Sequence, residues 1–236
     1  MSTNIFLVSV FANLLGNFFA LIIGLIYCYL KNHLPYVKIF LFYLFVSIAV
    51  EVLANPVFFH LPQFWRDPDF ARITTYNLFK PFELFIFSWF LFQIIHSPTV
   101  KKVLVGSIVT FCVFFACYSW FFGIGNNIDQ ITVILETIIL IFPCFTWYRE
   151  VFTYKESIDF LREPEFWLVS GIFFYLCVII PFASSISYIA HHRLFKLGAT
   201  LSSINTFSYL IMYCLFVKGF TCRSGPKAHP ATSIPN

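Results

Sequence analysis

The sequence predicts an all-α membrane protein, a bundle of seven transmembrane helices. Charged residues make up only 11% of the 236 residues, 59% are hydrophobic, and 34 are phenylalanine. A globular domain carries about a quarter charged residues, so this chain has more apolar side chain than a soluble fold can hide. Seven apolar stretches, each long enough to cross a bilayer, occupy most of the chain. The lipid bilayer is therefore the first expected partner.

Each predicted helix is an uninterrupted apolar run that exceeds the roughly 30 Å hydrocarbon core at about 1.5 Å per residue. Long helices satisfy their backbone polar groups within lipid, and the alternating pattern of a β-barrel is absent from the sequence. The first run is too long for a cleaved signal peptide, and no lysine or arginine precedes it. In chain order the predicted spans are 5–30, 38–59, 76–96, 101–121, 128–148, 166–189 and 198–218.

Lysine and arginine set the predicted orientation, because the richer side faces the cytoplasm. The side that holds the C-terminus carries ten: Lys31, Lys38, Lys101, Lys102, Arg149, Lys155, Arg162, Lys218, Arg223 and Lys227. The other side carries four: Arg66, Arg72, Arg193 and Lys196. We expect the N-terminus outside and the C-terminus in the cytoplasm, in the inner (plasma) membrane. Residues 1–218 would form the transmembrane domain, and 219–236 a disordered cytoplasmic tail.

Two loops have structure of their own in this prediction. The inner loop from Arg149 to Glu163 has apolar residues at helical spacing, which indicates an amphipathic helix on the membrane surface or an extension of the fifth helix. This loop could also dock a partner protein in the cytoplasm. In the outer loop, Asp67-Pro68-Asp69 is a plausible N-cap for a short helix.

Four charged residues, Glu51, Lys80, Glu83 and Glu136, fall within predicted spans. Charged side chains at membrane depth are costly and usually functional. Counted from the outer ends of their helices, all four lie roughly 6–14 Å below the outer boundary. Their formal charges sum to −2, which favours a cation, an amine or protons as ligand. The sequence therefore predicts a shared polar pocket that opens outward.

Uncharged polar residues extend this pattern on neighbouring helix faces, and prolines beside the charged residues would kink the helices and open the outer half. The predicted ligand-binding or proton-binding residues are Glu51, Asn55, Asn77, Lys80, Glu83, Glu136, Ser202 and Asn205. Two alternatives stay open. Serine and asparagine stripes also act as hydrogen-bonding contacts between packed helices, and Lys80 with Glu83 could be a simple intrahelical pair.

Several classes of function find no support. There is no soluble basic patch for nucleic acid. The seven cysteines lack metal-ligand spacing, no HExxH motif occurs, and no Ser-His or Cys-His pair lies at membrane depth. The histidines lie at helix ends, where an interfacial role is expected, although an outer metal site from His60, His191 and His192 is conceivable. The sequence thus predicts no metal or cofactor and does not favour an enzyme.

One stretch supports a resemblance. Phe166-Trp167-Leu168-Val169-Ser170-Gly171-Ile172-Phe173-Phe174-Tyr175 resembles the start of the sixth helix in small seven-span bacterial membrane proteins of unassigned function. The layout is also similar to seven-helix sensory modules that precede bacterial signalling domains. The resemblance carries over no site residue, and a fused output domain is missing, so signalling would require a separate partner.

The leading hypothesis is a membrane sensor or ligand-binding module with an outward-facing polar pocket. The alternative is a small transporter, which could be proton-coupled and would use the same carboxylates as a relay. The inner half of the predicted bundle is almost entirely apolar, which argues against an inner access path. A scaffold protein and a lipid-modifying enzyme are weaker alternatives.

Overall fold

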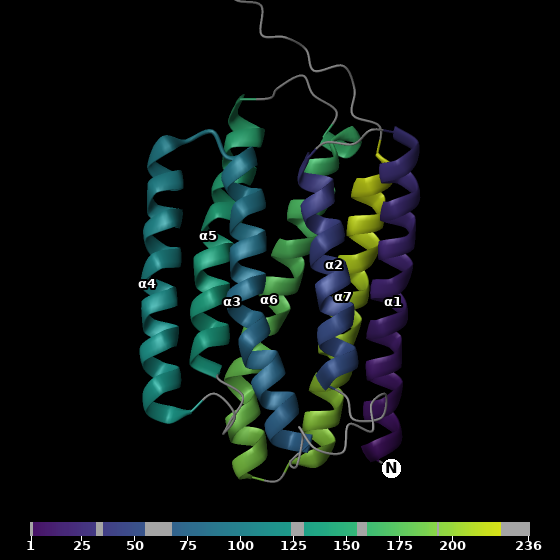
Figure 1. Cartoon of the computed structure of the whole chain (residues 1–236), viewed down its shortest axis with the longest axis vertical. Coiled ribbons are helices and arrows are strands. Elements are labelled where there is room, and N and C mark those ends of the chain that lie inside the picture. The colour runs from purple at the N-terminus through teal and green to yellow at the C-terminus, as the bar shows by residue number, and fades with distance from the viewer. Residues whose placement is uncertain are drawn as a thin grey trace, which may run out of the picture.

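The computed structural model describes residues 2–31, 35–54, 68–123, 130–154, 160–192 and 194–222. Within these ranges the chain is a bundle of seven long α-helices without strands (Figure 1). The helices are α1 (Ser2–Lys31), α2 (Pro35–Ala54), α3 (Pro68–Ile94), α4 (Pro98–Phe122), α5 (Gln130–Tyr154), α6 (Pro164–His191) and α7 (Phe195–Thr221), with a 3₁₀ turn η1 (Phe160–Arg162) before α6. The predicted all-α class is confirmed.

Six of the described helices are long and apolar enough to cross a membrane, namely α1, α2, α4, α5, α6 and α7. The chain is thus a multi-pass membrane protein by the length and composition of its helices. α3 is the exception, because Asn77, Lys80 and Glu83 lower its hydropathy. The prediction of seven spans is supported for six of them. α3 still runs the length of the bundle beside the others (Figure 1).

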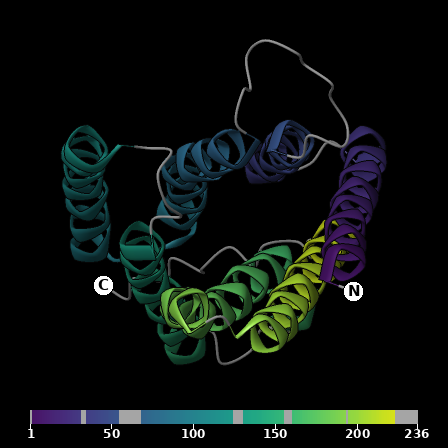
Figure 2. The same ribbon diagram turned by 90° about the horizontal axis from the view of Figure 1, so that it is seen from below.

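Six helices form a closed ring, in the order α1, α2, α3, α5, α6, α7 and back to α1. α4 lies outside this ring and packs only against α3 and α5 in the described part of the chain. Figure 2 shows the arrangement, with α4 at one edge and α1 at the other. Since α4 has few neighbours, most of its apolar side chains are exposed, as expected of a helix that faces lipid.

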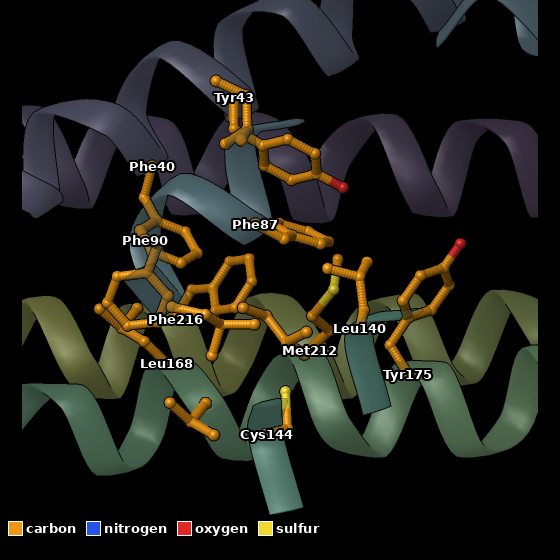
Figure 3. Close-up of a cluster of buried hydrophobic side chains, with 14 of the residues drawn as sticks. Phe40, Tyr43, Phe87, Phe90, Leu140, Cys144, Leu168, Tyr175, Met212 and Phe216 are labelled. Carbon is orange, nitrogen blue, oxygen red and sulfur yellow. The ribbon is translucent and has the colours of Figure 1, made fainter. Parts of the chain in front are cut away.

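The apolar core lies toward the end of the ring where α2 and α6 begin and where α3 and α7 finish. Phe40 packs edge-to-face on Phe90 and Phe216, with ring centroids 4.8 and 4.9 Å apart. All three rings are completely buried, and Leu168 of α6 closes the cluster (Figure 3). This is the end that the lysine and arginine count predicts to be cytoplasmic. The expectation of an apolar inner half agrees with this packing.

Small residues let α1 approach its neighbours closely. Gly16, Ala20 and Gly24 recur every four residues and therefore share one face. A Cβ atom on Gly24 would lie 2.5 Å from Leu41 Cδ2 on α2 and 3.0 Å from Phe220 Cε2 on α7. Close backbone approach at small residues is a common way for helices to associate in lipid, where dispersion contacts replace the hydrophobic effect.

Most helix ends lie within about three residues of the prediction, and two described ends differ by more. α3 begins at Pro68, eight residues before the predicted start at Tyr76, so the expected short outer helix forms the first turns of α3 itself. Proline is favoured at the first position of a helix, so Pro68 is a suitable start for α3. α5 continues to Tyr154, which agrees with the predicted alternative of a longer fifth helix.

Other predictions fall partly outside the described residues. Asn55, Pro56 and His60 lie in the range 55–67, which is not described, and so do residues 155–159 of the inner loop. α7 ends at Thr221, three residues into the predicted tail, and 223–236 lie outside the described residues. The prolines Pro81, Pro143 and Pro181 lie inside α3, α5 and α6, which continue through them.

Candidate functional site

The candidate site is centred on Lys80 of α3. Lys80 Nζ lies 2.5 Å from Glu83 Oε2, one helical turn further along the same helix. Glu83 is 1% exposed, and the Lys80 side chain is 14% exposed. The intrahelical pair that the i,i+3 spacing allows is therefore present, and it is buried rather than solvated.

A second carboxylate approaches from α5. Glu136 Oε2 lies 3.6 Å from Lys80 Nζ, and Glu136 is 2% exposed. Its other oxygen, Oε1, is buried and has no hydrogen-bond partner among the residues that the structure describes. Lys80 thus faces both carboxylates, with Glu83 the nearer of the two. A buried carboxylate oxygen without a donor is costly, so this atom marks the site as chemically unusual.

Tyrosine hydroxyls complete the group. Tyr43 of α2 donates a hydrogen bond of 2.9 Å to Glu83 Oε1. Lys80 Nζ donates to the hydroxyl of Tyr175 on α6 at 3.4 Å, and Tyr175 shares a hydrogen bond of 2.8 Å with Tyr209 on α7. We call these six residues the Lys80 cluster: Tyr43, Lys80, Glu83, Glu136, Tyr175 and Tyr209.

The Lys80 cluster connects five helices, α2, α3, α5, α6 and α7, at one level of the ring. Figure 3 shows that the hydroxyls of Tyr43 and Tyr175 point the same way, away from Phe40, Phe90 and Phe216. The polar cluster therefore borders the apolar core. Helices joined by buried polar contacts are held in a specific rotation, because each unmade contact would leave a polar atom in an apolar medium.

The charges of the Lys80 cluster do not balance. One ammonium and two carboxylates sum to −1, and all three groups are largely removed from water. An uncompensated charge in a medium of low dielectric constant is strongly disfavoured. The arrangement can therefore accept one further positive charge.

Glu51 lies apart from the other two acidic residues. It is half-buried on α2 and accepts a 3.0 Å hydrogen bond from the hydroxyl of Tyr76, which lies one turn before Lys80 on α3. The expected convergence of three carboxylates thus holds for Glu83 and Glu136, whereas Glu51 pairs with Tyr76, one turn nearer the end of the ring where α3 begins. The reason is the packing of α2 on α3, which sets Glu51 opposite Tyr76.

The uncharged candidates take different places. Asn77 is buried on α3, one turn before Lys80. Asn205 lies one turn before Tyr209 on α7, and its Oδ1 is buried with no partner in the described ranges. The half-buried Ser202 is a further turn away, and its carbonyl accepts a hydrogen bond from Thr206. Asn55 lies outside the described residues.

The predicted site residues omit four tyrosines that the structure places at the site: Tyr43, Tyr76, Tyr175 and Tyr209. Tyr209 had a usable signal, because it lies four residues after Asn205 on the same face of α7. Tyr43 had a usable signal, because Tyr43, Ser47 and Glu51 are spaced four residues apart and share a face of α2. Tyr76 likewise lies next to Asn77 and one turn before Lys80. Tyr175 had none: its neighbours one turn away on α6, Ile172 and Ile179, are apolar.

A second polar contact has a simpler explanation. Asn17 of α1 donates a 2.9 Å hydrogen bond to Ser47 of α2, and both are buried. This bond links two adjacent helices of the ring, as the helix-packing alternative expects of such stripes.

Across the residues that the structure describes, no group of three or more histidine, cysteine, aspartate or glutamate side chains could hold a metal ion. The proposed outer histidine site includes His60 and the side chain of His191, which are not described. No family model, curated protein or solved structure matches the chain.

Proposed function

We propose that this protein is an integral membrane sensor or ligand-binding module of the plasma membrane. Its ligand site is the Lys80 cluster, and a separate cytoplasmic protein receives the signal. The observation that supports this proposal is a buried, charge-imbalanced group whose members come from five helices. A ligand that changes the charge there changes contacts among α2, α3, α5, α6 and α7 at once.

α5 is the natural route to the cytoplasmic side. It carries Glu136 near its start and continues for more than four turns to Tyr154. On the way, the hydroxyl of Tyr148 lies 2.7 Å from Ser170 Oγ of α6. Glu150 accepts hydrogen bonds of 2.9 and 3.0 Å from the backbone amides of His96 and Ser97, just before α4. A shift of α5 would therefore reach both α6 and α4.

The proposal includes seven crossings, with α3 as the polar one. α3 has 27 residues, or about 40 Å of helix. Its charged residues at mid-length are paired inside the ring, which lowers the cost of placing them in lipid. Seven crossings and the lysine and arginine asymmetry support an outer N-terminus and a cytoplasmic C-terminus.

The second candidate is a small transporter that uses Glu136 and Glu83 to relay protons. It needs alternating access from both sides. The fully buried rings of Phe40, Phe90 and Phe216 pack against one another in the inner half of the ring, which disfavours a path for ions and solutes there. This packing favours the sensor over the transporter.

The test is a thermal-shift ligand screen on the purified full chain, repeated over a range of pH. We expect Glu136→Gln to alter the ligand response or its pH dependence. Glu51→Gln probes the neighbouring carboxylate, and Glu150→Gln, on the same helix at its far end, is the matched control. If neither Glu136→Gln nor Glu51→Gln changes the response, both the sensor and the proton-relay proposals fail. Uptake of labelled substrate into proteoliposomes would favour the transporter.

A further inference from the structure

We propose that the Lys80 cluster binds one proton, held on the free oxygen of Glu136. This inference specifies the ligand of the site under the proposed function and rests on that function for its biological meaning. The proton comes from water, and its binding converts the carboxylate of Glu136 into a neutral carboxylic acid.

The sum of charges favours one bound proton. Lys80 can compensate one carboxylate. That carboxylate is Glu83, whose Oε2 lies 2.5 Å from Lys80 Nζ. Glu136, at 3.6 Å from the same ammonium, is left with a weaker partner. Two carboxylates that share one ammonium in an apolar interior behave as a coupled pair, and one bound proton removes the surplus charge.

The unpartnered oxygen of Glu136 favours the protonated form of this side chain. Glu136 Oε1 is buried, the residue is 2% exposed, and the described residues offer that oxygen no hydrogen-bond donor. Ionised, this oxygen carries half of a negative charge without stabilisation. Protonated, it becomes a neutral hydroxyl, and the cost of leaving it in an apolar surrounding falls.

The groups that face Glu136 do not remove the imbalance. The neighbouring helix α3 carries Lys80 and Glu83. The neighbouring helix α6 carries Tyr175, whose hydroxyl is hydrogen-bonded to Lys80 and to Tyr209 of α7. From α2, the hydroxyl of Tyr43 donates to Glu83. A neutral tyrosine hydroxyl adds no charge, so the sum stays at −1.

Helix α4, which lies outside the ring, supplies no counter-charge at the level of Glu136. Its lysines, Lys101 and Lys102, are in its first turn, at the opposite end from the start of α5. Its tyrosine, Tyr118, is in ring contact with Phe114 and Phe122 of α4 itself. A proton also needs no set of coordinating ligands, because it bonds to a single oxygen and the water that delivered it leaves. The hydroxyl of Tyr175 already makes hydrogen bonds with Lys80 and Tyr209.

The experiment is an infrared pH titration of the full chain in lipid nanodiscs. A protonated carboxylic acid has a C=O stretching band that a carboxylate lacks. We expect one buried protonated acid at neutral pH, whose band disappears as the pH rises. Glu51→Gln is the matched control and should keep the band, because Glu51 is not part of the Lys80 cluster.

Charge-changing variants make the inference quantitative. Glu136→Gln and Glu83→Gln each bring the sum of charges to zero, so both should lose the band. Lys80→Gln lowers the sum to −2 and should add a second protonated acid. Because Glu83→Gln and Glu136→Gln are independent, failure of one variant to fold leaves the other as the test.

Three results would overturn the inference. The first is a band that persists in both Glu136→Gln and Glu83→Gln. The second is a wild-type chain with no protonated carboxylic acid at any pH at which it is folded. The third is a titration that shifts when sodium or methylammonium chloride replaces choline chloride at equal ionic strength, which would mark a competing cation site. If the band behaves as expected but Glu136→Gln leaves the ligand screen unchanged, the proton site stands and the sensor proposal fails.

Discussion

Lys80 Nζ on α3 lies 3.6 Å from Glu136 Oε2 on α5, and this contact joins the most polar helix of the ring to its neighbour. The same ammonium also pairs with Glu83, so a single positive charge supports two buried carboxylates. Lys80 should therefore matter more for stability than either acid, and its neighbours should matter through their hydrogen bonds.

Removing Lys80 tests that ranking. Lys80→Gln leaves two buried carboxylates without a counter-charge, and loss of one partner from a buried ion pair costs about 3–5 kcal/mol. We expect a large fall in the midpoint of thermal unfolding in detergent, and a smaller fall for Glu136→Gln. Lys102→Gln, at an exposed position on α4, should change stability by less than about 0.5 kcal/mol. Equal effects of Lys80→Gln and Lys102→Gln would contradict the burial of the cluster.

Tyr43→Phe tests the hydrogen bond that α2 gives to Glu83. The substitution removes only the hydroxyl, which donates to Glu83 Oε1 at 2.9 Å. Hydrogen bonds to charged groups contribute about 1.5–3 kcal/mol, so we expect a loss of that order in the free energy of unfolding. Tyr29→Phe is the matched control, because Tyr29 is 92% exposed and should be insensitive. A silent Tyr43→Phe would show that Glu83 does not depend on α2.

Gly171→Ala tests the close packing of α6 on α7. A Cβ there would meet Phe216 Cε1 at 2.9 Å and the backbone carbonyl of Met212 at 3.3 Å. Phe216 is completely buried, so its ring has little room to move, and overpacking of this kind costs about 1–3 kcal/mol. Gly106→Ala is the control on α4, where nothing lies within 4 Å of the new atom. That substitution should stabilise its helix by about 1 kcal/mol, and both effects are read as unfolding midpoints.

Glu150→Ala tests the attachment of α4 to the ring. Glu150 accepts the backbone amides of His96 and Ser97, at the N-cap end of α4. Loss of such an acceptor costs about 0.5–2 kcal/mol, and the effect should be local because α4 packs only on α3 and α5 in the described part of the chain. We expect faster amide hydrogen exchange in the first turns of α4. Arg149→Ala, exposed on the same helix, should leave that exchange unchanged.

Much of the fold could be predicted from local pattern. Apolar runs of sufficient length give helices in any arrangement, so every predicted span corresponds to a helix, with shifts at the ends. The largest shift is at α3, where the short helix expected near Asp67-Pro68-Asp69 and the third predicted span form one continuous helix from Pro68. Its early turns form because helix propensity does not require an apolar sequence.

The candidate site could be predicted only in part. Lys80 and Glu83 are an i,i+3 pair on any helix, so their contact follows from the sequence. The contact with Glu136 and the separation of Glu51 do not, because they depend on how α2, α3 and α5 rotate about their axes. Tyr175 shows the same limit. It is an isolated tyrosine on an apolar stretch, and it accepts a hydrogen bond from Lys80 only because α6 packs into the ring.

The sequence by itself determined the membrane class, the helices and the presence of a few charges inside them, because these follow from composition and from the length of apolar runs. The tertiary structure alone decided that α4 stands outside the ring and that Lys80 faces two carboxylates at once. The physical reason is that the free energy of placing a residue in the membrane depends on that residue alone, so it can be read from the sequence. Pairing acts between faces of different helices, and their relative rotation is fixed by packing over the whole bundle.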